Sequence, residues 1–305
     1  MALSQADRER LVRQRFGGRA RGLTPLASGE WSAAYALTLD GRDAVIRFGA
    51  HLEDFAKDEV MGRHARAGLP IPPVLEIGEA DDGYYAVSLR VPGEPIDDLG
   101  GAAVQAVLPQ LLHALAALQE VAIEGRQGFG LWRADGAAPD ATWARYLLAV
   151  GEPSPRLPGW RERLDRHACA ARAFDAGCAR LAAMARGIGE HPGIVHADLL
   201  NRNVLVHGGR LSGVIDWGNA LYGDPLYDVA WLQYWWPWYP AWRAVDLGAI
   251  LSRHWLRHGG MPAQAEERLG CYRLHIGLQA IAYTAFRGRA DDLARNAAQV
   301  LGDLR

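Results

Sequence analysis

The sequence contains few cysteines and a single lysine. Cys169, Cys178 and Cys271 are an odd number, widely spaced, with no Cys-x-x-Cys pair, so neither a disulfide framework nor a zinc site is expected. The lysine, Lys57, lies in the segment Phe-Ala-Lys-Asp. A Walker-type phosphate loop requires Gly-Lys followed by Ser or Thr, so the sequence excludes that route to nucleotide binding.

An excess of charge of one sign is also absent. The 305 residues carry a formal net charge of -2, whereas a dedicated nucleic-acid binder uses a basic surface to neutralise phosphates. The N-terminus MALSQADRER has no apolar segment of the kind found in signal peptides. No uncharged apolar stretch is expected to approach the roughly 18 residues of a membrane span. We therefore expect a soluble, cytoplasmic protein that binds neither nucleic acid nor a membrane.

The first part of the chain predicts a small, mainly antiparallel sheet. Apolar and polar residues alternate over 23–48, and the Asp40-Gly41 pair between two β-prone runs is typical of a two-residue hairpin turn. The segment EDFAKDEVMGRHARAG predicts a helix that ends at Gly68, because three prolines follow closely. The expected elements are helices over 4–16 and 53–68, and strands over 34–39, 44–48, 74–77 and 84–91.

The segment VPGEPIDDLGG is predicted to be a hinge. Prolines and glycines crowd there, and the spacing of apolar residues changes from a period of 2 to one of 3.6. The fold class is thus α+β, with an N-terminal unit over 1–91 and a mainly helical unit over 92–305. Five leucines beyond the hinge fall on one helical face: Leu108, Leu111, Leu112, Leu115 and Leu118. Further helices are expected over 141–150, 158–187, 240–258, 263–285 and 289–301.

One polar stretch interrupts the helical unit. Residues 203–216 consist of a short apolar run, a glycine turn and a second apolar run, which together predict a β-hairpin. Antiparallel pairing about that turn places Val206 opposite Leu211 and Asn203 near Val214. The residues that flank the two strands are therefore expected to meet at the open end of the hairpin.

Asn203 and Asp216 are the polar residues at that open end. An amide oxygen and a carboxylate suit Mg²⁺, which keeps several waters and shares the rest of its coordination shell with substrate phosphates. Asp198 lies five residues before Asn203, within a loop's reach, and a third acid there is suited to accepting a hydroxyl proton. Asn and Asp are common in turns, but three acceptors at one end of a hairpin indicate a functional site.

The motif His196-x-Asp198-x-x-x-x-Asn203, followed by Ile215-Asp216, resembles the catalytic loop and metal-binding aspartate of the aminoglycoside phosphotransferase family, small-molecule relatives of protein kinases. The similarity spans nearly the whole chain in order and is greatest to the branch that acts on hygromycin B. The matching segments are Val-Ile-Arg at 45–47, GLPIPPVLEIGE at 68–79, HADLLNRNVL at 196–205, VIDWGNALYGD at 214–224 and WWPW at 235–238.

The resemblance implies a bilobal, protein-kinase-like fold with ATP and Mg²⁺ between a small antiparallel-sheet lobe and a mainly helical lobe. It implies an O-phosphotransferase with an alcohol group as acceptor, acting on an aminoglycoside antibiotic, hygromycin B favoured, and conferring resistance as a monomer. Asp198 would orient and deprotonate the acceptor hydroxyl, while Asn203 and Asp216 would hold Mg²⁺ on the phosphates.

Further roles follow from the same resemblance. His196 is expected to orient the loop by hydrogen bonding, and a purely structural histidine is the equal alternative. Asp228 and Asp224 are expected to support the catalytic loop from behind without binding metal. Asn201 and Arg202, beside the catalytic aspartate, are candidate contacts to substrate or phosphate.

Arg47 stands where protein kinases carry the phosphate-binding lysine of the third strand. Arginine keeps the positive charge of lysine, and its guanidinium can donate two parallel hydrogen bonds to a phosphate. Its partner acid is expected to be Glu59 or, one residue earlier, Asp58, with Glu59 preferred. Backbone N–H groups of Ser28 and Gly29 are expected at the phosphates, although a plain hairpin turn explains both residues equally well. The adenine is expected between Val45 and Leu205, with hinge hydrogen bonds from the backbone between Leu89 and Val91.

The segment WLQYWWPWYPAW is the aromatic feature of the chain. Aromatic clusters are more often core than binding surface, but prolines break this one, so both interpretations stay open. As a substrate surface, Trp235, Trp236 and Trp238 would support sugar rings. Acids available for a polycationic ligand are Asp97, Asp98, Asp135, Asp140 and Asp246.

Two other functions share these motifs. A kinase of a macrolide, choline, homoserine or another small metabolite would use the same loop. A nucleotide-binding pseudokinase would be expected to have lost Asp198, Asn203 or Asp216, and all three are present.

Overall fold

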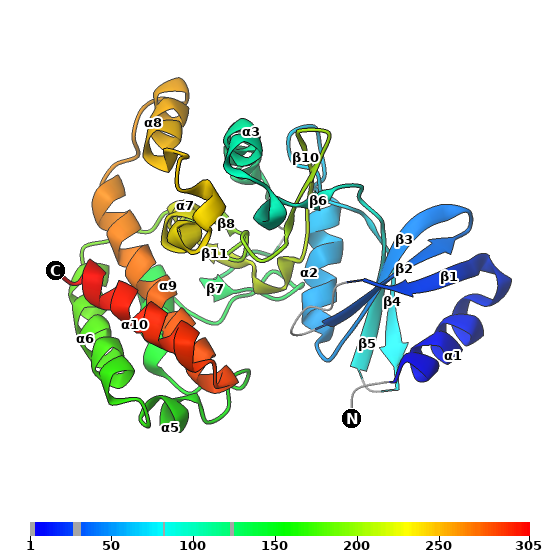
Figure 1. Ribbon diagram of the computed structural model, residues 1–305, viewed down its shortest axis with the longest axis horizontal. Coiled ribbons are helices and arrows are strands. Elements are labelled where there is room, and N and C mark those ends of the chain that lie inside the picture. The colour runs from blue at the N-terminus through cyan, green and yellow to red at the C-terminus, as the bar shows by residue number, and fades with distance from the viewer. Residues whose placement is uncertain (1–3, 27–31, 82, 123–124) are drawn as a thin grey trace.

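The computed structural model describes residues 4–26, 32–81, 83–122 and 125–305 of the chain. A strand-rich N-terminal lobe lies beside a larger helical lobe (Figure 1). Each lobe has its own hydrophobic core, one built from the N-terminal sheet with its first helix, the other almost wholly from residues beyond the predicted hinge. This is the α+β, two-lobed arrangement that the sequence predicts.

Five antiparallel strands form the N-terminal sheet, in the order β1-β2-β3-β5-β4. On β3, Ala44, Ile46 and Phe48 are buried in the sheet core, so Val45 and Arg47 lie on the opposite face. The lobe comprises α1 (Gln5–Phe16), β1 (Ala20–Pro25), β2 (Ser32–Leu39), β3 (Arg42–Gly49), β4 (Val74–Ala80) and β5 (Gly83–Leu89).

The turn between β2 and β3 is the predicted Asp40-Gly41 pair. Both residues have a positive φ, 50° and 75°, as in the type I′ turn, whose twist matches that of the flanking strands. Asp40 also pairs with Arg19 at 2.7 Å. The local sequence therefore determines this hairpin.

Helix α2 (Leu52–Gly62) lies between the lobes (Figure 1) and ends at Gly62, not at the predicted Gly68. A Cβ atom on Gly62 would stand only 3.1 Å from the carbonyl oxygen of Pro72. The chain turns there, and Arg66 and Leu69 exchange two backbone hydrogen bonds of 3.2 and 3.0 Å. Close packing against the proline segment overrides the helical pattern of the following residues.

The helical lobe contains most of the predicted helices, with two differences. The helix expected over 158–187 is divided near His167, whose N–H bonds to Leu164 O at 2.8 Å in a tighter turn. The helix expected from 240 begins at Leu247, because Pro240–Trp242 forms a short 3-10 turn. The helices are α3 (Gly101–Leu118), α4 (Trp143–Leu148), α5 (Trp160–Leu164), α6 (Ala168–Ala185), α7 (Leu226–Trp235), α8 (Leu247–Arg257), α9 (Ala265–Arg287) and α10 (Ala290–Asp303).

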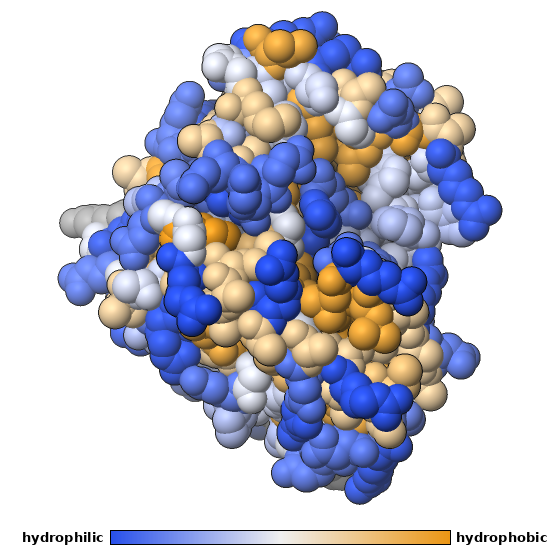
Figure 2. Space-filling model, turned by 90° about the vertical axis from the view of Figure 1, so that its left-hand side faces the viewer, coloured by the Kyte–Doolittle hydropathy of each residue, from blue (hydrophilic) through white to orange (hydrophobic). Residues whose placement is uncertain are grey.

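The outer face of this lobe is mostly hydrophilic. Figure 2 shows apolar side chains there in separate patches between polar ones. The three cysteines are unpaired, as predicted: Cys169 and Cys178 lie on α6 and Cys271 on α9.

Helix α3 corrects one expectation from the sequence. Its 18 residues contain no charged side chain, and by length and composition the helix could cross a membrane. Val104, Val107, Leu108 and Leu111 are nevertheless fully buried in the core of the helical lobe. An apolar helix of this kind is also typical of a protein core, so its composition has an explanation within the fold.

Two three-stranded sheets hold the polar stretch in place. In one, β6 extends the predicted hairpin by pairing with β9, and because β6 lies within the segment predicted to be the hinge, that segment is anchored to the hairpin. In the other, β11 lies between β7 and β8. The strands are β6 (Glu94–Pro95), β7 (Gly130–Leu131), β8 (Gly193–Val195), β9 (Val204–His207), β10 (Arg210–Val214) and β11 (Leu221–Gly223).

A buried ion pair ties the beginning of α7 to α9. Asp224, which is fully buried, accepts two hydrogen bonds of 2.6 Å from the guanidinium of Arg268 and one of 2.5 Å from the hydroxyl of Tyr272. Its carboxylate also accepts the N–H of Leu226 at 3.0 Å. All of these partners belong to α7 or α9, so Asp224 supports the packing of the lobe.

We predict that Arg268→Ala lowers the free energy of unfolding by about 3–5 kcal/mol, because Asp224 is left charged and buried without its partner. Urea denaturation followed by tryptophan fluorescence measures this. The matched control is Arg63→Ala, which breaks the exposed pair with Glu59 and should change the value by less than about 1 kcal/mol. Equal losses in the two variants would contradict the prediction.

Candidate active site

The loop of residues 196–203 joins β8 to β9, and one carboxylate fixes its beginning. Asp228 on α7 accepts the backbone N–H groups of His196 at 2.9 Å and Ala197 at 2.8 Å. Ala197 has a φ of 59°, a conformation that is uncommon for residues other than glycine. Asp228 is buried, and burial raises its pKa to about 7. This acid therefore holds the loop from behind, as predicted, and lies away from solvent.

The hairpin has the predicted turn but a shifted register near its open end. Val206 pairs with Leu211 as predicted. A bulge in β10 then brings Val214 opposite Val204, not near Asn203 as the simple register predicts. The extra residue of the bulge, which the apolar pattern alone does not reveal, accounts for the difference.

Asn203 and Asp216 nevertheless lie at the same end of the hairpin. The N–H of Ile215 donates to the carbonyl of Asn203 at 2.9 Å, and Asp216 follows directly. The side-chain amide of Asn203 donates to the backbone carbonyl of Asp198 at 2.8 Å, which leaves its amide oxygen as the end that can bind a metal. Asp216 has a φ of 62°, and such strain in a residue other than glycine is typical of functional sites.

The carboxylate of Asp198 is buried close to other acids. Burial raises its pKa to about 8, and the charges of Asp216 and Asp97 act in the same direction, whereas the amides of Asn219 and Asn201 act against them. Asn219 donates to Asp198 Oδ2 at 3.0 Å. A carboxylate with a pKa close to neutral pH is suited to general-base catalysis.

The imidazole of His196 connects the catalytic loop with the segment before Asp216. Its Nε2 lies 3.0 Å from the carbonyl oxygen of Ile215, and its ring packs on Trp217 with 4.6 Å between centroids. Burial lowers its pKa to about 4, so the ring is neutral at pH 7. A carbonyl only accepts hydrogen bonds, so Nε2 carries the hydrogen. The geometry matches the orienting role expected from the sequence.

The ion pair of Arg47 differs from the preferred prediction. Arg47 on β3 pairs with Asp58 on α2, whereas Glu59 is more exposed and pairs with Arg63 at 3.1 Å. Successive helical residues are rotated by about 100°, so Asp58 faces the sheet and Glu59 points away. The preference for Glu59 is therefore wrong, and the alternative, Asp58, is the partner.

Asp58 also connects α2 to the segment that follows the hairpin. Its Oδ1 accepts the backbone N–H of Trp217 at 2.8 Å, and Arg47 Nη1 lies 3.5 Å from Asp216 Oδ1. Burial opposes the charge of Arg47, but the carboxylates of Asp58 and Asp216 outweigh it and raise the pKa of the guanidinium. Both lobes thus contribute to one charged cluster beside Asp216.

The residues expected around the adenine lie near the hinge. Val45 is on the inner face of β3, and Leu89 ends β5. Val91 packs closely on Gly213, where an added Cβ atom would stand 2.9 Å from Val91 Cγ1, and Gly213 pairs with Leu205. Val91 and Leu205 are thus both neighbours of Gly213. Two further predicted residues, Ser28 and Gly29, lie outside the described part of the chain.

Two of the predicted substrate tryptophans contact each other, and one of them contacts α10. Trp238 Nε1 donates to Gln299 at 3.0 Å, and the guanidinium of Arg295 lies 3.8 Å from the centre of a Trp238 ring. Trp235 contacts Trp238 edge-on, with 5.2 Å between ring centroids, and is partly buried against the core of the helical lobe. Both side chains thus have packing partners within the protein, and their contact with a substrate stays a prediction.

Tyr239 is the aromatic residue of this segment that reaches the catalytic loop. Trp236 packs on Trp242, and Trp242 stacks on Tyr239 with 3.9 Å between ring centroids. The hydroxyl of Tyr239 donates to Asp97 at 2.8 Å and lies 3.2 Å from the carbonyl of Leu200. Trp242 thus lies between Trp236 and Tyr239, and contact of Trp236 with a substrate stays a prediction.

Asp97 and Asp98 hold the second half of the catalytic loop. Asp97 accepts the backbone N–H of Arg202 at 3.1 Å, and Asp98 binds the Arg202 guanidinium through two hydrogen bonds of 2.9 Å. The side chain of Arg202, predicted to contact substrate, is therefore already engaged within the protein. Asn201 is exposed and lies close enough to Asp198 to affect its pKa.

Sequence reasoning missed Asn219 and Tyr239. Asn219 follows Asp216 by three residues, and this short spacing was the available signal. Tyr239 and Asp97 are 142 residues apart in the chain, and no local pattern connects them.

Comparison with known proteins agrees with this geometry. The profile of a family described as phosphotransferase enzyme family matches residues 22–266. The chain is 33% identical to hygromycin-B 4-O-kinase of Escherichia coli over 276 residues, covering 89% of this chain and 77% of that protein. It is 28% identical to viomycin phosphotransferase of Streptomyces vinaceus over 260 residues, covering 78% and 81%.

A solved structure extends this likeness to three dimensions. A thermostable mutant of aminoglycoside phosphotransferase APH(4)-Ia, in ternary complex with AMP-PNP and hygromycin B, matches with a TM-score of 0.81 and 31% identity over 97% of each chain. The likeness confirms the predicted family resemblance and the bilobal fold.

We predict that carboxyl ¹³C NMR of the free protein finds the pKa of Asp198 near 8 and that Asn219→Ala raises it by about one unit, because one charge-assisted hydrogen bond to the carboxylate is lost. Asn201→Ala should raise the pKa less, since its amide has the smaller effect. A pKa near 4 in the unaltered protein, or a decrease in Asn219→Ala, would show that burial does not control this carboxylate.

Proposed function

The chain belongs to the phosphotransferase enzyme family, and from this premise we propose that it transfers the γ-phosphoryl group of ATP to a hydroxyl group of an aminoglycoside antibiotic, with hygromycin B favoured. The observation that carries the proposal is the convergence of Asp198, Asn203 and Asp216 at the open end of one hairpin. One relative that resembles this chain over most of its length is named hygromycin-B 4-O-kinase. Such an enzyme would confer resistance on its host.

Asp198 is the proposed general base. Its pKa near 8 in the free protein means that it is partly protonated at neutral pH, and any positive charge that enters the site lowers this value. A polycationic aminoglycoside supplies such charge next to the hydroxyl that must lose its proton. The acceptor would thereby favour the ionised form of the base that orients it.

Asn203 and Asp216 are the proposed ligands of Mg²⁺. Both offer oxygen atoms, and the carboxylate of Asp216 is 43% exposed, so water and phosphate oxygens have access to the remaining positions. Mg²⁺ is usually held by one or two protein groups together with substrate phosphates. When bound there it would neutralise charge on the transferring phosphoryl group.

Arg47 and Asp58 are proposed to position the phosphates from the N-terminal side. Asp58 holds the guanidinium and, through Trp217, the segment after Asp216. In this proposal residues 1–91 bind the nucleotide, with Val45, Leu89, Val91 and Leu205 around the adenine, and residues 92–305 carry the catalytic loop and acceptor site.

The acids at the catalytic loop favour a cationic acceptor. Asp97 and Asp98 lie beside Arg202, and the charge of Asp97 reaches Asp198. With only Arg202 to balance them, these carboxylates make the acceptor side negative, which attracts aminosugars. We further propose that the protein is a monomer. We propose that it acts in the cytoplasm, where both ATP and the antibiotic are available.

We predict that the purified protein, in a coupled ATPase assay, turns over ATP with hygromycin B or another aminoglycoside. Asp198→Asn should reduce the rate by about 10²–10⁴, the usual contribution of a general base. Asp165→Asn, on the exposed pair with Arg161, is the control and should retain full activity.

The outcomes separate the alternatives. Absence of turnover with every aminoglycoside would reject the proposal. Turnover with choline or homoserine alone would indicate a metabolite kinase, and ATP binding without turnover on any acceptor would indicate a pseudokinase.

A second prediction concerns the nucleotide. Asp58→Ala should weaken binding of AMP-PNP with Mg²⁺ by about tenfold or more, because Arg47 loses the charge-assisted hydrogen bond that positions it. Glu59→Ala should leave the affinity within about twofold, since that side chain is held by Arg63 on the outer face. Isothermal titration measures both, with circular dichroism to verify folding. Weaker binding in the Glu59 variant alone would contradict the assignment of Asp58.

A further inference from the structure

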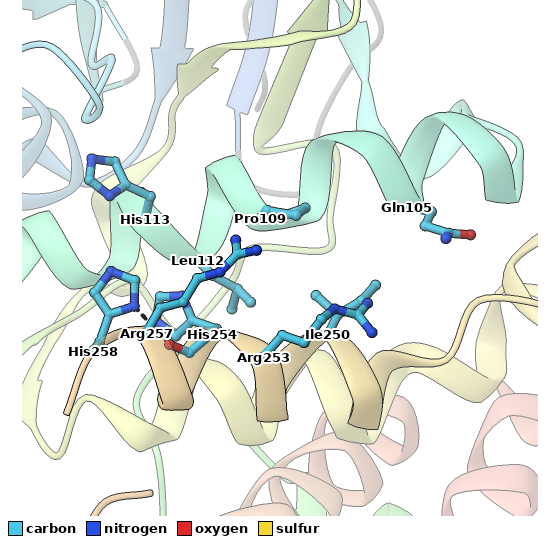
Figure 3. A pocket seen from close by; sticks show the side chains of 9 residues that line it. All are labelled: Gln105, Pro109, Leu112, His113, Ile250, Arg253, His254, Arg257 and His258. Carbon is cyan, nitrogen blue, oxygen red and sulfur yellow. Dashed lines mark hydrogen bonds between the residues drawn. The ribbon is translucent and has the colours of Figure 1, made fainter. Parts of the chain in front are cut away.

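A groove runs between α3 and α8, and the residues that line it belong to neither the catalytic loop nor the hinge. Its volume is about 280 Å³. Figure 3 shows side chains from the two helices on either side of it. Pro109 and Leu112 from α3 and Ile250 from α8 give the groove an apolar base, and Leu112 and Ile250 are almost wholly buried.

Five basic side chains line the groove above this base: His113 from α3, Arg253, His254 and Arg257 from α8, and His258 directly after α8. The three on α8 recur at helical spacing after Ile250, so they share one face of the helix. No carboxylate lines the groove. The formal net charge of the chain is -2 with neutral histidines, so the two arginines make the groove locally positive.

The two arginines have unused hydrogen-bonding capacity. Neither Arg253 nor Arg257 has an ion pair or hydrogen bond with the residues that the structure describes. By contrast, Arg268 near the start of α9 donates two hydrogen bonds, from Nε and Nη2, to the carboxylate of Asp224. A guanidinium presents a planar set of N–H donors that fits phosphate or carboxylate. Both side chains are exposed, so their donors are accessible to an anion that enters the groove.

The histidines of the groove are also suited to binding an anion. The rings of His254 and His258 stack with 4.2 Å between centroids, and His258 Nδ1 donates to the carbonyl of His254 at 2.8 Å. Burial lowers the pKa of His254, and the neighbouring His258 and His113 lower it further. An anion among these rings would reverse that effect by stabilising their protonated forms.

A metal ion fits the groove less well. Within the described ranges no group of three or more His, Cys, Asp or Glu side chains is arranged to hold one. Two arginines beside the histidines would also repel a cation.

We propose that the groove between α3 and α8 binds a small anion of the phosphate class with at least two negative charges. Arg253 and Arg257 bind its oxygens, and the ring N–H groups of His113, His254 and His258 add hydrogen-bond donors. Inorganic polyphosphates and phosphate esters share this chemistry, and the apolar base accommodates the carbon portion of an ester. The inference does not depend on the catalytic activity.

Isothermal titration of the full chain with inorganic pyrophosphate, without Mg²⁺, tests the proposal. The double variant Arg253→Gln/Arg257→Gln should bind at least about tenfold more weakly, because two charge-assisted contacts are lost. The control Arg180→Gln/Arg186→Gln removes the same charge from exposed positions on α6 and directly after it and should bind within about twofold of the unaltered chain.

The NMR signals of the imidazole rings of His113, His254 and His258 show whether the anion binds in this groove. Pyrophosphate should shift them in the unaltered chain and in Arg47→Gln, whose change lies at the active site, but not in the groove double variant. Adenosine monophosphate and pyrophosphate, compared in the same way, distinguish a phosphate ester from an inorganic ligand. No binding at millimolar pyrophosphate, equal loss in the α6 control, or binding abolished by Arg47→Gln alone would overturn the proposal.

Discussion

The buried carboxylate of Asp228 accepts two successive backbone N–H groups, those of His196 and Ala197, and the geometry of the catalytic loop depends on this pair of hydrogen bonds. A left-handed conformation at Ala197 costs energy that the loop alone does not recover. Two bonds to one carboxylate fix it, and they also fix the direction in which the chain proceeds to Asp198. The neutral imidazole of His196 is hydrogen-bonded to the carbonyl of Ile215. This bond links the catalytic loop to the residue before Asp216.

Electrostatic compensation explains the rest of the site. Burial raises the pKa of Asp198, and the charges of Asp216 and Asp97 raise it further. Like charges that are buried close together cost free energy. Arg47 offsets part of this cost and is itself held by Asp58. Arg47 and Asp58 come from the N-terminal lobe and Asp216 from the helical lobe, so the attraction between Arg47 and Asp216 also links the two lobes. A metal ion and a cationic acceptor would complete that balance during catalysis.

Particular residues show how far sequence reasoning reached. The hairpin at 203–216, the turn at Asp40-Gly41 and the first helix follow from local patterns, and the structure contains all three. The choice between Glu59 and Asp58 required the rotational position of α2 against β3, which a charge pattern in one helix does not contain. The tryptophans at 235–238 illustrate the same limit. Their composition fits both a core and a binding surface, and only the structure shows that Trp238 contacts Gln299 and Arg295 on α10.

The sequence by itself determined the order of the two lobes, the hairpin and the acids and amides at its open end, because turn chemistry and apolar periodicity act over a few residues. Only the tertiary structure decided which side chains complete the site. Tyr239 meets Asp97, Asp58 meets Arg47 and Trp217, and Asn219 meets Asp198. Most of these contacts join segments far apart in the chain, and their partners are selected by packing and by the need to pair buried charge, neither of which is encoded at a fixed spacing.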